Sequence, residues 1–161
     1  MSQAATPRDV LHPAGRRVTQ EIAKAFAIYW MRHLGYHDAR LVRGDGLHPA
    51  CISSSEAVAL VETAGKPVGQ AAIGALISVA ARRSRQPLCF SLSDYTREAR
   101  ALADGKAVAL FVIDLAGGIR GVEGLARLLL SNARDRHLRH CLEAMARSLD
   151  RRQRGRAARQ G

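Results

Sequence analysis

Aromatic side chains are scarce in this sequence, since Phe, Trp and Tyr make up only 4% of its 161 residues. A buried core must therefore be built mainly from Ala, Val, Leu and Ile. Cysteine is also scarce, with Cys51, Cys89 and Cys141 far apart along the chain. The odd number and the wide spacing exclude a disulfide framework and a cysteine-built zinc site, and they favour a reducing compartment.

Long apolar runs are missing as well. No uninterrupted apolar segment approaches the roughly 20 residues that span a bilayer, and the first residues lack the apolar stretch of a signal peptide. We therefore expect a cytoplasmic protein without membrane contact. The length suits one compact domain with short tails.

Acidic residues are the third shortage: 14 acidic residues face 25 basic ones, for a net charge of +11. All but three of the basic residues are arginines, which bind phosphate through two parallel hydrogen bonds. From Asn132 onward nine arginines face three acidic residues, so the C-terminal end carries more than half of the excess. Such an excess predicts a polyanionic partner rather than a particular fold.

Hydrophobic periodicity predicts alternating helices and strands. We expect helices at 16–33 and 68–83, and a short helix that Asp94 caps and that ends at residue 103. Residues 117–124 are expected to form a glycine-rich loop, and helical periodicity resumes after it. Strands are expected at 39–43, 50–54, 57–63, 87–92 and 107–114. Three successive strands between helices indicate an α/β fold with a mixed sheet of about five strands flanked by helices. The expected parts are a flexible N-terminus (1–14), the domain (15–131), a C-terminal helix (132–149) and a basic disordered tail (150–161).

Several short motifs occur in this chain in the same order and at similar spacing as in one enzyme family. They are Leu34-Gly35-Tyr36, Gly44-Asp45-Gly46, the strand ending at Glu62, Pro67-Val68-Gly69, Tyr95-Thr96 and the strand ending at Asp114. Between about residues 21 and 130 the chain resembles the Mrr-like (type IV restriction endonuclease) branch of the PD-(D/E)XK nucleases. The resemblance implies an αβββαβ restriction-endonuclease-like core.

The catalytic positions that the resemblance implies carry the wrong side chains. Glu62 replaces the family's lysine, and Leu60 replaces an acid or amide. The first aspartate falls among Pro49, Ala50 and Cys51. Since Mg²⁺ requires oxygen ligands, the resemblance implies a DNA-binding protein that is catalytically impaired, a pseudonuclease without a cofactor.

A displaced active site is the alternative that the residues leave open. Glu62 and Asp45 would supply carboxylates and Lys66 an ammonium group, which would make an active Mg²⁺-dependent DNA endonuclease. In the competing interpretation, Asp45 belongs to a tight turn, Glu62 ends a strand in solvent and Lys66 lies on a surface turn.

Two groups of cations are candidates for contact with DNA, which we expect to be double-stranded and bound without sequence preference. One group is expected near the former cleft: Arg43, Lys66, Arg82, Arg83 and Arg85. The other is the tail, with Arg151, Arg152, Arg154, Arg156 and Arg159. These partners predict association with the nucleoid and no small-molecule substrate.

A dimeric scaffold or regulatory module is the third hypothesis. The apolar positions of the last expected helix form one stripe, which consists of Leu138, Cys141, Leu142, Met145 and Leu149. This stripe predicts a homodimer.

Overall fold

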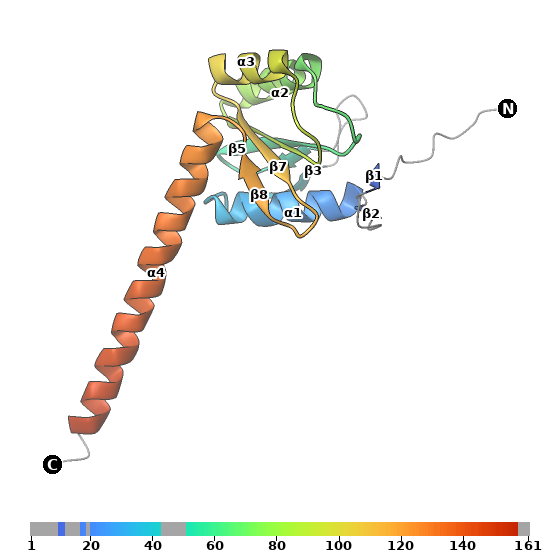
Figure 1. The fold of residues 1–161 in the computed structure, drawn as a ribbon. Coiled ribbons are helices and arrows are strands. Elements are labelled where there is room, and N and C mark those ends of the chain that lie inside the picture. Colours follow the sequence, from blue (N-terminus) through green and yellow to red (C-terminus); the bar gives the residue numbers. More distant parts are fainter. Residues whose placement is uncertain (1–9, 12–16, 19, 43–50, 158–161) are drawn as a thin grey trace.

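The fold is an α/β domain from which one long helix projects (Figure 1). The structure is a computed structural model that describes residues 10–11, 17–18, 20–42 and 51–157. Strands β1 (Val10–Leu11) and β2 (Arg17–Val18) form a small antiparallel pair. The helix expected from residue 16 therefore begins later, as α1 (Gln20–His33), because Val18 pairs with Val10 instead.

The main sheet has six strands in the order β3-β4-β5-β6-β7-β8. Strands β3 (Arg40–Val42), β4 (Cys51–Ser53) and β5 (Ala57–Glu62) are antiparallel neighbours. Strands β6 (Gln86–Ser91) and β7 (Ala109–Ile113) continue from β5 in parallel. Helix α2 (Gln70–Arg83) connects β5 to β6. The predicted α/β class and the mixed, helix-flanked sheet are confirmed, and the elements from α1 to β6 follow the αβββαβ order.

A sixth strand, β8 (Ile119–Gly121), pairs antiparallel with β7 where we expected only a glycine-rich loop. Gly121 is needed for close approach rather than for flexibility. A Cβ atom there would lie 2.8 Å from the backbone nitrogen of Arg127, at the start of the next helix. The glycine thus lets α4 (Gly124–Ala157) cross tightly over the edge strand.

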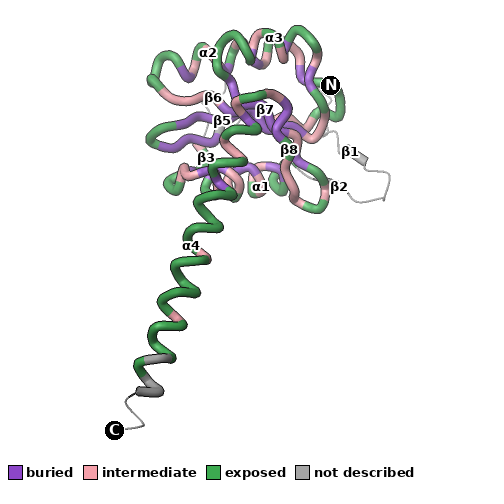
Figure 2. Tube along the Cα trace, turned by 60° about the vertical axis from the view of Figure 1, so that its left-hand side comes forward, coloured by how far each residue is buried: buried purple, intermediate pink, exposed green. Residues whose placement is uncertain are grey.

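Helices cover both faces of the sheet (Figures 1 and 2). Ala57, Ala59 and Val61 of β5 pack in the core on the side of α1, while Val58 and Leu60 pack on the side of α2 and α3 (Arg97–Gly105). Successive residues of a strand point to opposite faces. The continuous apolar run of β5 therefore reflects burial on both sides, as expected for strands in parallel pairing.

The cap of α3 differs from the expectation. Thr96, not Asp94, is the N-cap residue, and its hydroxyl accepts a hydrogen bond from the Ala99 backbone nitrogen at 3.2 Å. The Asp94 carboxylate instead accepts hydrogen bonds from the Tyr95 backbone (2.9 Å) and the Arg100 guanidinium (2.6 Å). Both residue types cap helices, so the sequence did not distinguish them.

Helix α4 is continuous over 34 residues. The expected boundary at 131/132 falls inside it, and the expected disordered tail from Asp150 is helical to Ala157. Lack of an apolar face suggested disorder, but Arg, Gln and Ala are good helix formers, and Asp150 pairs with Arg154 one turn later at 2.9 Å. Among the described residues, no helix is both long and apolar enough to cross a membrane.

We predict that Tyr95→Phe lowers the free energy of unfolding by about 1–3 kcal/mol, because buried carbonyl groups lose a donor. The Tyr95 hydroxyl is buried between β6 and β7, 2.9 Å from the carbonyl oxygen of Cys89 and 2.7 Å from that of Phe111. Urea denaturation measures the change. Tyr29→Phe, at a position that is 60% exposed, is the control and should stay within about 0.5 kcal/mol of the parent chain. Equal effects of both substitutions would contradict the assignment.

Candidate nucleic-acid interface

The position that the resemblance assigns to the catalytic lysine lies at the carboxyl end of β5, where Glu62 pairs with Ser91 of β6. This edge of parallel strands is where open α/β sheets place their ligands. Leu60, at the family's acid position, is only 3% exposed and packs in the core beneath α2. An apolar side chain thus occupies a position from which the family chemistry needs oxygen.

Glu62 itself is partly buried. Burial raises the pKa of its carboxyl group, and the Lys66 ammonium partly opposes this shift. Glu62 and Lys66 are therefore near enough to interact, although no ion pair joins them among the described residues. Asp45 and Arg43 lie outside the described residues, so the displaced three-residue site stays a prediction. Within the described part of the chain, no three His, Cys, Asp or Glu side chains come together as a metal site.

We expected Arg82, Arg83 and Arg85 near the cleft that the resemblance implies, at the carboxyl end of β5. This prediction is wrong, because the three residues lie near the amino end of β5. Helix α2 starts after the carboxyl end of β5 and runs back, so these residues precede Gln86, which pairs with Ala57 at the other end of β5. At about 3.3 Å per residue the two ends of β5 are about 17 Å apart. The Arg85 guanidinium donates a hydrogen bond to the Ser53 hydroxyl, which gives it a structural role.

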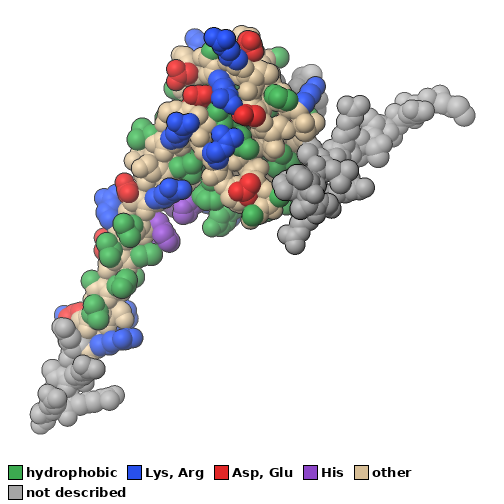
Figure 3. Space-filling view, in the orientation of Figure 1, with side chains coloured by type: hydrophobic (Ala, Val, Ile, Leu, Met, Phe, Trp, Pro, Cys, Tyr) green, Lys and Arg blue, Asp and Glu red, His purple; other side chains and the backbone are tan. Residues whose placement is uncertain are grey.

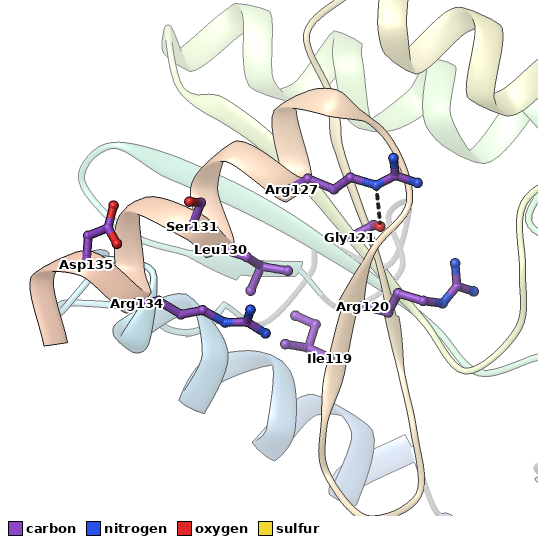
Figure 4. Close-up of a pocket in the computed structure, with 8 residues that line it drawn as sticks. All are labelled: Ile119, Arg120, Gly121, Arg127, Leu130, Ser131, Arg134 and Asp135. Atoms are coloured by element: carbon purple, nitrogen blue, oxygen red, sulfur yellow. Dashed lines mark hydrogen bonds between the residues drawn. The ribbon is translucent and has the colours of Figure 1, made fainter. Parts of the chain in front are cut away.

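A second group of arginines surrounds a hollow of about 390 Å³ between β8 and α4 (Figure 4). We call it the basic hollow, and its lining consists of Ile119, Arg120, Gly121, Arg127, Leu130, Ser131, Arg134 and Asp135. Arg127 and Arg134 are seven residues apart and therefore lie on the same side of α4. The Arg127 Nε donates a hydrogen bond to the Gly121 carbonyl oxygen at 3.4 Å, which holds the helix against the edge strand.

The basic hollow contains more positive than negative side chains. Arg120, Arg127 and Arg134 are all exposed, and none forms an ion pair with another described residue. Asp135 is the one acidic residue in the lining. Nearby, Asp94 forms an ion pair with Arg100 at 2.6 Å. The pKa of Asp94 is lowered mainly by the hydrogen bond from the Tyr95 backbone, and Arg100 lowers it further. Lys and Arg side chains lie over this face, with Asp and Glu side chains among them (Figure 3).

The basic hollow could not be predicted from the sequence, because the glycines of residues 117–124 are typical of a loop. Only the pairing of β8 with β7 brings Arg120 beside α4. Of the expected tail cations, Arg151, Arg152 and Arg154 are exposed on α4, and Arg154 is paired with Asp150. Arg156 belongs to the helical range, and Arg159 lies outside the described residues.

Comparison with known proteins adds no relative: no family model, no curated protein and no solved structure matches this chain. The likeness to Mrr-like nucleases therefore stays a prediction from the motifs.

We predict that Glu62→Gln stabilises the fold at neutral pH but not in acid. At pH values between the ordinary pKa of Glu62 and its raised pKa in the fold, the folded chain holds a proton that the unfolded chain has released. The free energy of unfolding of the parent chain therefore falls as pH rises through this range. The free energy of unfolding of the variant should exceed that of the parent chain at pH 7, and the difference should shrink toward about pH 3.5.

Urea denaturation across this pH range measures the difference. Glu56→Gln removes one negative charge from an exposed position and serves as the control. A Glu62→Gln difference that is constant with pH would contradict the burial of the carboxyl group.

Proposed function

We propose that this protein binds double-stranded DNA without sequence preference and without cutting it. The observation that carries the proposal is the basic hollow, where three exposed arginines from β8 and α4 surround one cavity and form no ion pair with a described residue. Arginine forks match phosphate oxygens in pairs, and such contacts supply most of the affinity in non-specific binding. Association with the nucleoid follows from this activity.

Phosphate contact, rather than base stacking, suits the chemistry of the hollow. Its lining contains no aromatic ring, whereas binding of single strands depends on aromatic side chains on which bases stack. Arg151 and Arg152 extend the positive charge along the exposed length of α4. A duplex has phosphates on both strands and can meet both parts of this surface.

The absence of cutting rests on the chemistry of Leu60 and Glu62. Magnesium-dependent cleavage needs carboxylates that hold the ion and a group that assists the attacking water. The position for one carboxylate is a buried leucine, and the lysine position is a partly buried glutamate. The resemblance to Mrr-like nucleases therefore accounts for the order of the elements, while the side chains favour a DNA-binding role.

We predict that Arg120→Gln, Arg127→Gln and Arg134→Gln together weaken binding to a short DNA duplex. Each lost phosphate contact should reduce the magnitude of the log-log salt slope by about 0.9, so the slope should become shallower by up to about 2.7. Fluorescence anisotropy between about 50 and 200 mM salt measures both the affinity and the slope.

The matched control removes the same charge at three positions that do not line the basic hollow, with Arg82→Gln, Arg83→Gln and Lys106→Gln. All three residues are exposed, and we expect the salt slope to stay close to that of the parent chain. An equal loss in both triple variants would show that only net charge matters. Tighter binding to duplex RNA than to duplex DNA would also contradict the proposal.

We further predict that supercoiled plasmid stays intact with the parent chain and Mg²⁺ or Mn²⁺, because the ion lacks its ligands. The measurement is the fraction of nicked plasmid on an agarose gel. Glu62→Ala is the matched variant. Nicking that is present in the parent chain and lost in this variant would instead support the displaced site.

A further inference from the structure

The outer part of α4 carries apolar side chains that meet nothing in the described chain. Leu138, Leu142, Met145 and Leu149 are each between 55% and 63% exposed. They follow one another at steps of four, three and four residues, which is the spacing of the a and d positions of a coiled coil. We call these four residues the seam.

The seam faces away from the domain. Ala126 and Ala133 are the buried positions by which the start of α4 packs on the core. At about 100° per residue, the seam lies about 150° around the helix axis from Ala133. Its heptad pattern extends back through Leu128 and Ser131, which are both exposed, although Ser131 also lines the basic hollow between α4 and β8. A second helix therefore has access to the seam, which lies on the part of α4 that projects from the described domain (Figures 1 and 2).

A helix that projects alone gains little from packing. Arg136 donates a hydrogen bond to the Leu34 carbonyl oxygen at 2.6 Å. Among the described residues, this is the last hydrogen bond along α4 that joins the helix to the domain. Beyond it α4 extends into solvent (Figures 1 and 2). Most helices in proteins are stabilised by the packing of an apolar face rather than by propensity, and this face has no partner within the described residues.

We propose that the seam binds the seam of a second copy of this chain, with the two helices antiparallel. In this arrangement Leu138 lies opposite the partner's Leu149, and Leu142 lies opposite the partner's Met145. The next layer outward places Asp135 opposite the partner's Arg152, at each end of the seam. The proposal does not depend on DNA binding.

Charge selects the antiparallel orientation. In parallel helices, Asp135 would lie beside the Asp135 of the second copy, and Arg152 beside its Arg152. Such like-charge pairs are unfavourable at the a and d positions. The antiparallel arrangement joins opposite charges instead. Neither residue forms an ion pair with a described residue, whereas the charges on the outer side of α4 pair within the helix, as Glu143 with Arg147 and Asp150 with Arg154.

The flanking positions are also compatible with this orientation. The antiparallel arrangement places Arg139 opposite the partner's Ala146 and Cys141 opposite the partner's Ser148. No like charges meet there, and small side chains allow the two backbones to approach.

Sedimentation equilibrium of the full chain, without DNA, tests the proposal. We expect twice the chain mass for the parent and the single chain mass for Leu142→Glu, whose side chain is exposed and not needed for the domain. Asp135→Arg and Arg152→Asp should each raise the dissociation constant by about 10-fold, and the double variant should restore it. Glu143→Arg makes the same charge change off the seam and should leave the mass unchanged. A single-chain mass for the parent would overturn the proposal.

Disulfide cross-linking tests the orientation. Leu138→Cys and Leu149→Cys are made as separate chains of different tag mass, mixed and oxidised. We expect mainly the mixed disulfide, because these positions lie opposite each other only in antiparallel helices. Each variant linked mainly to its own copy would overturn the antiparallel arrangement. The chain without added cysteine, treated in the same way, reports cross-links from the native cysteines.

Discussion

The burial of both faces of β5, β6 and β7 is the constraint on which the rest of the structure depends. These parallel strands are nearly continuous apolar runs, and Phe90 and Phe111 stack on neighbouring strands with ring centroids 5.0 Å apart. Because neither face can meet water, α1 must cover one and α2 with α3 the other. Only the edges remain open, and the start of α4 lies against β8, one of the edge strands. The basic hollow exists because a helix rich in arginine has to cross that edge.

The sequence predicted the interior well and the edges poorly. Apolar runs identify β5, β6 and β7 because complete burial leaves no other interpretation. Segment 119–121 has no such run, and the glycines in and around it indicated a loop, although Gly121 allows the close approach of α4. The helical end of α4 was missed for a related reason: without an apolar face, its helix-forming arginines and the Asp150–Arg154 pair are weak local signals.

The candidate site shows the same division. The prediction that this chain lacks the side chains for cutting needs only residue identity, because Leu60 and Glu62 differ in chemistry from the residues that the resemblance implies. The positions of cations cannot be predicted in this way, because they depend on topology. Arg82 and Arg83 appear close to Lys66 along the chain, yet α2 carries them to the far edge of the sheet. Arg120 and Arg134 belong to different elements, β8 and α4, but line one cavity.

Asp135 belongs to two surfaces at once. Its side chain lines the basic hollow, and its position on α4 continues the seam. In the proposed pair of helices, the partner's Arg152 would neutralise the one negative charge in the hollow. Binding equilibria that share a group are coupled with equal strength in both directions. Neutralisation of the Asp135 carboxylate by self-association would then raise the affinity for a polyanion. A bound polyanion would in turn favour self-association.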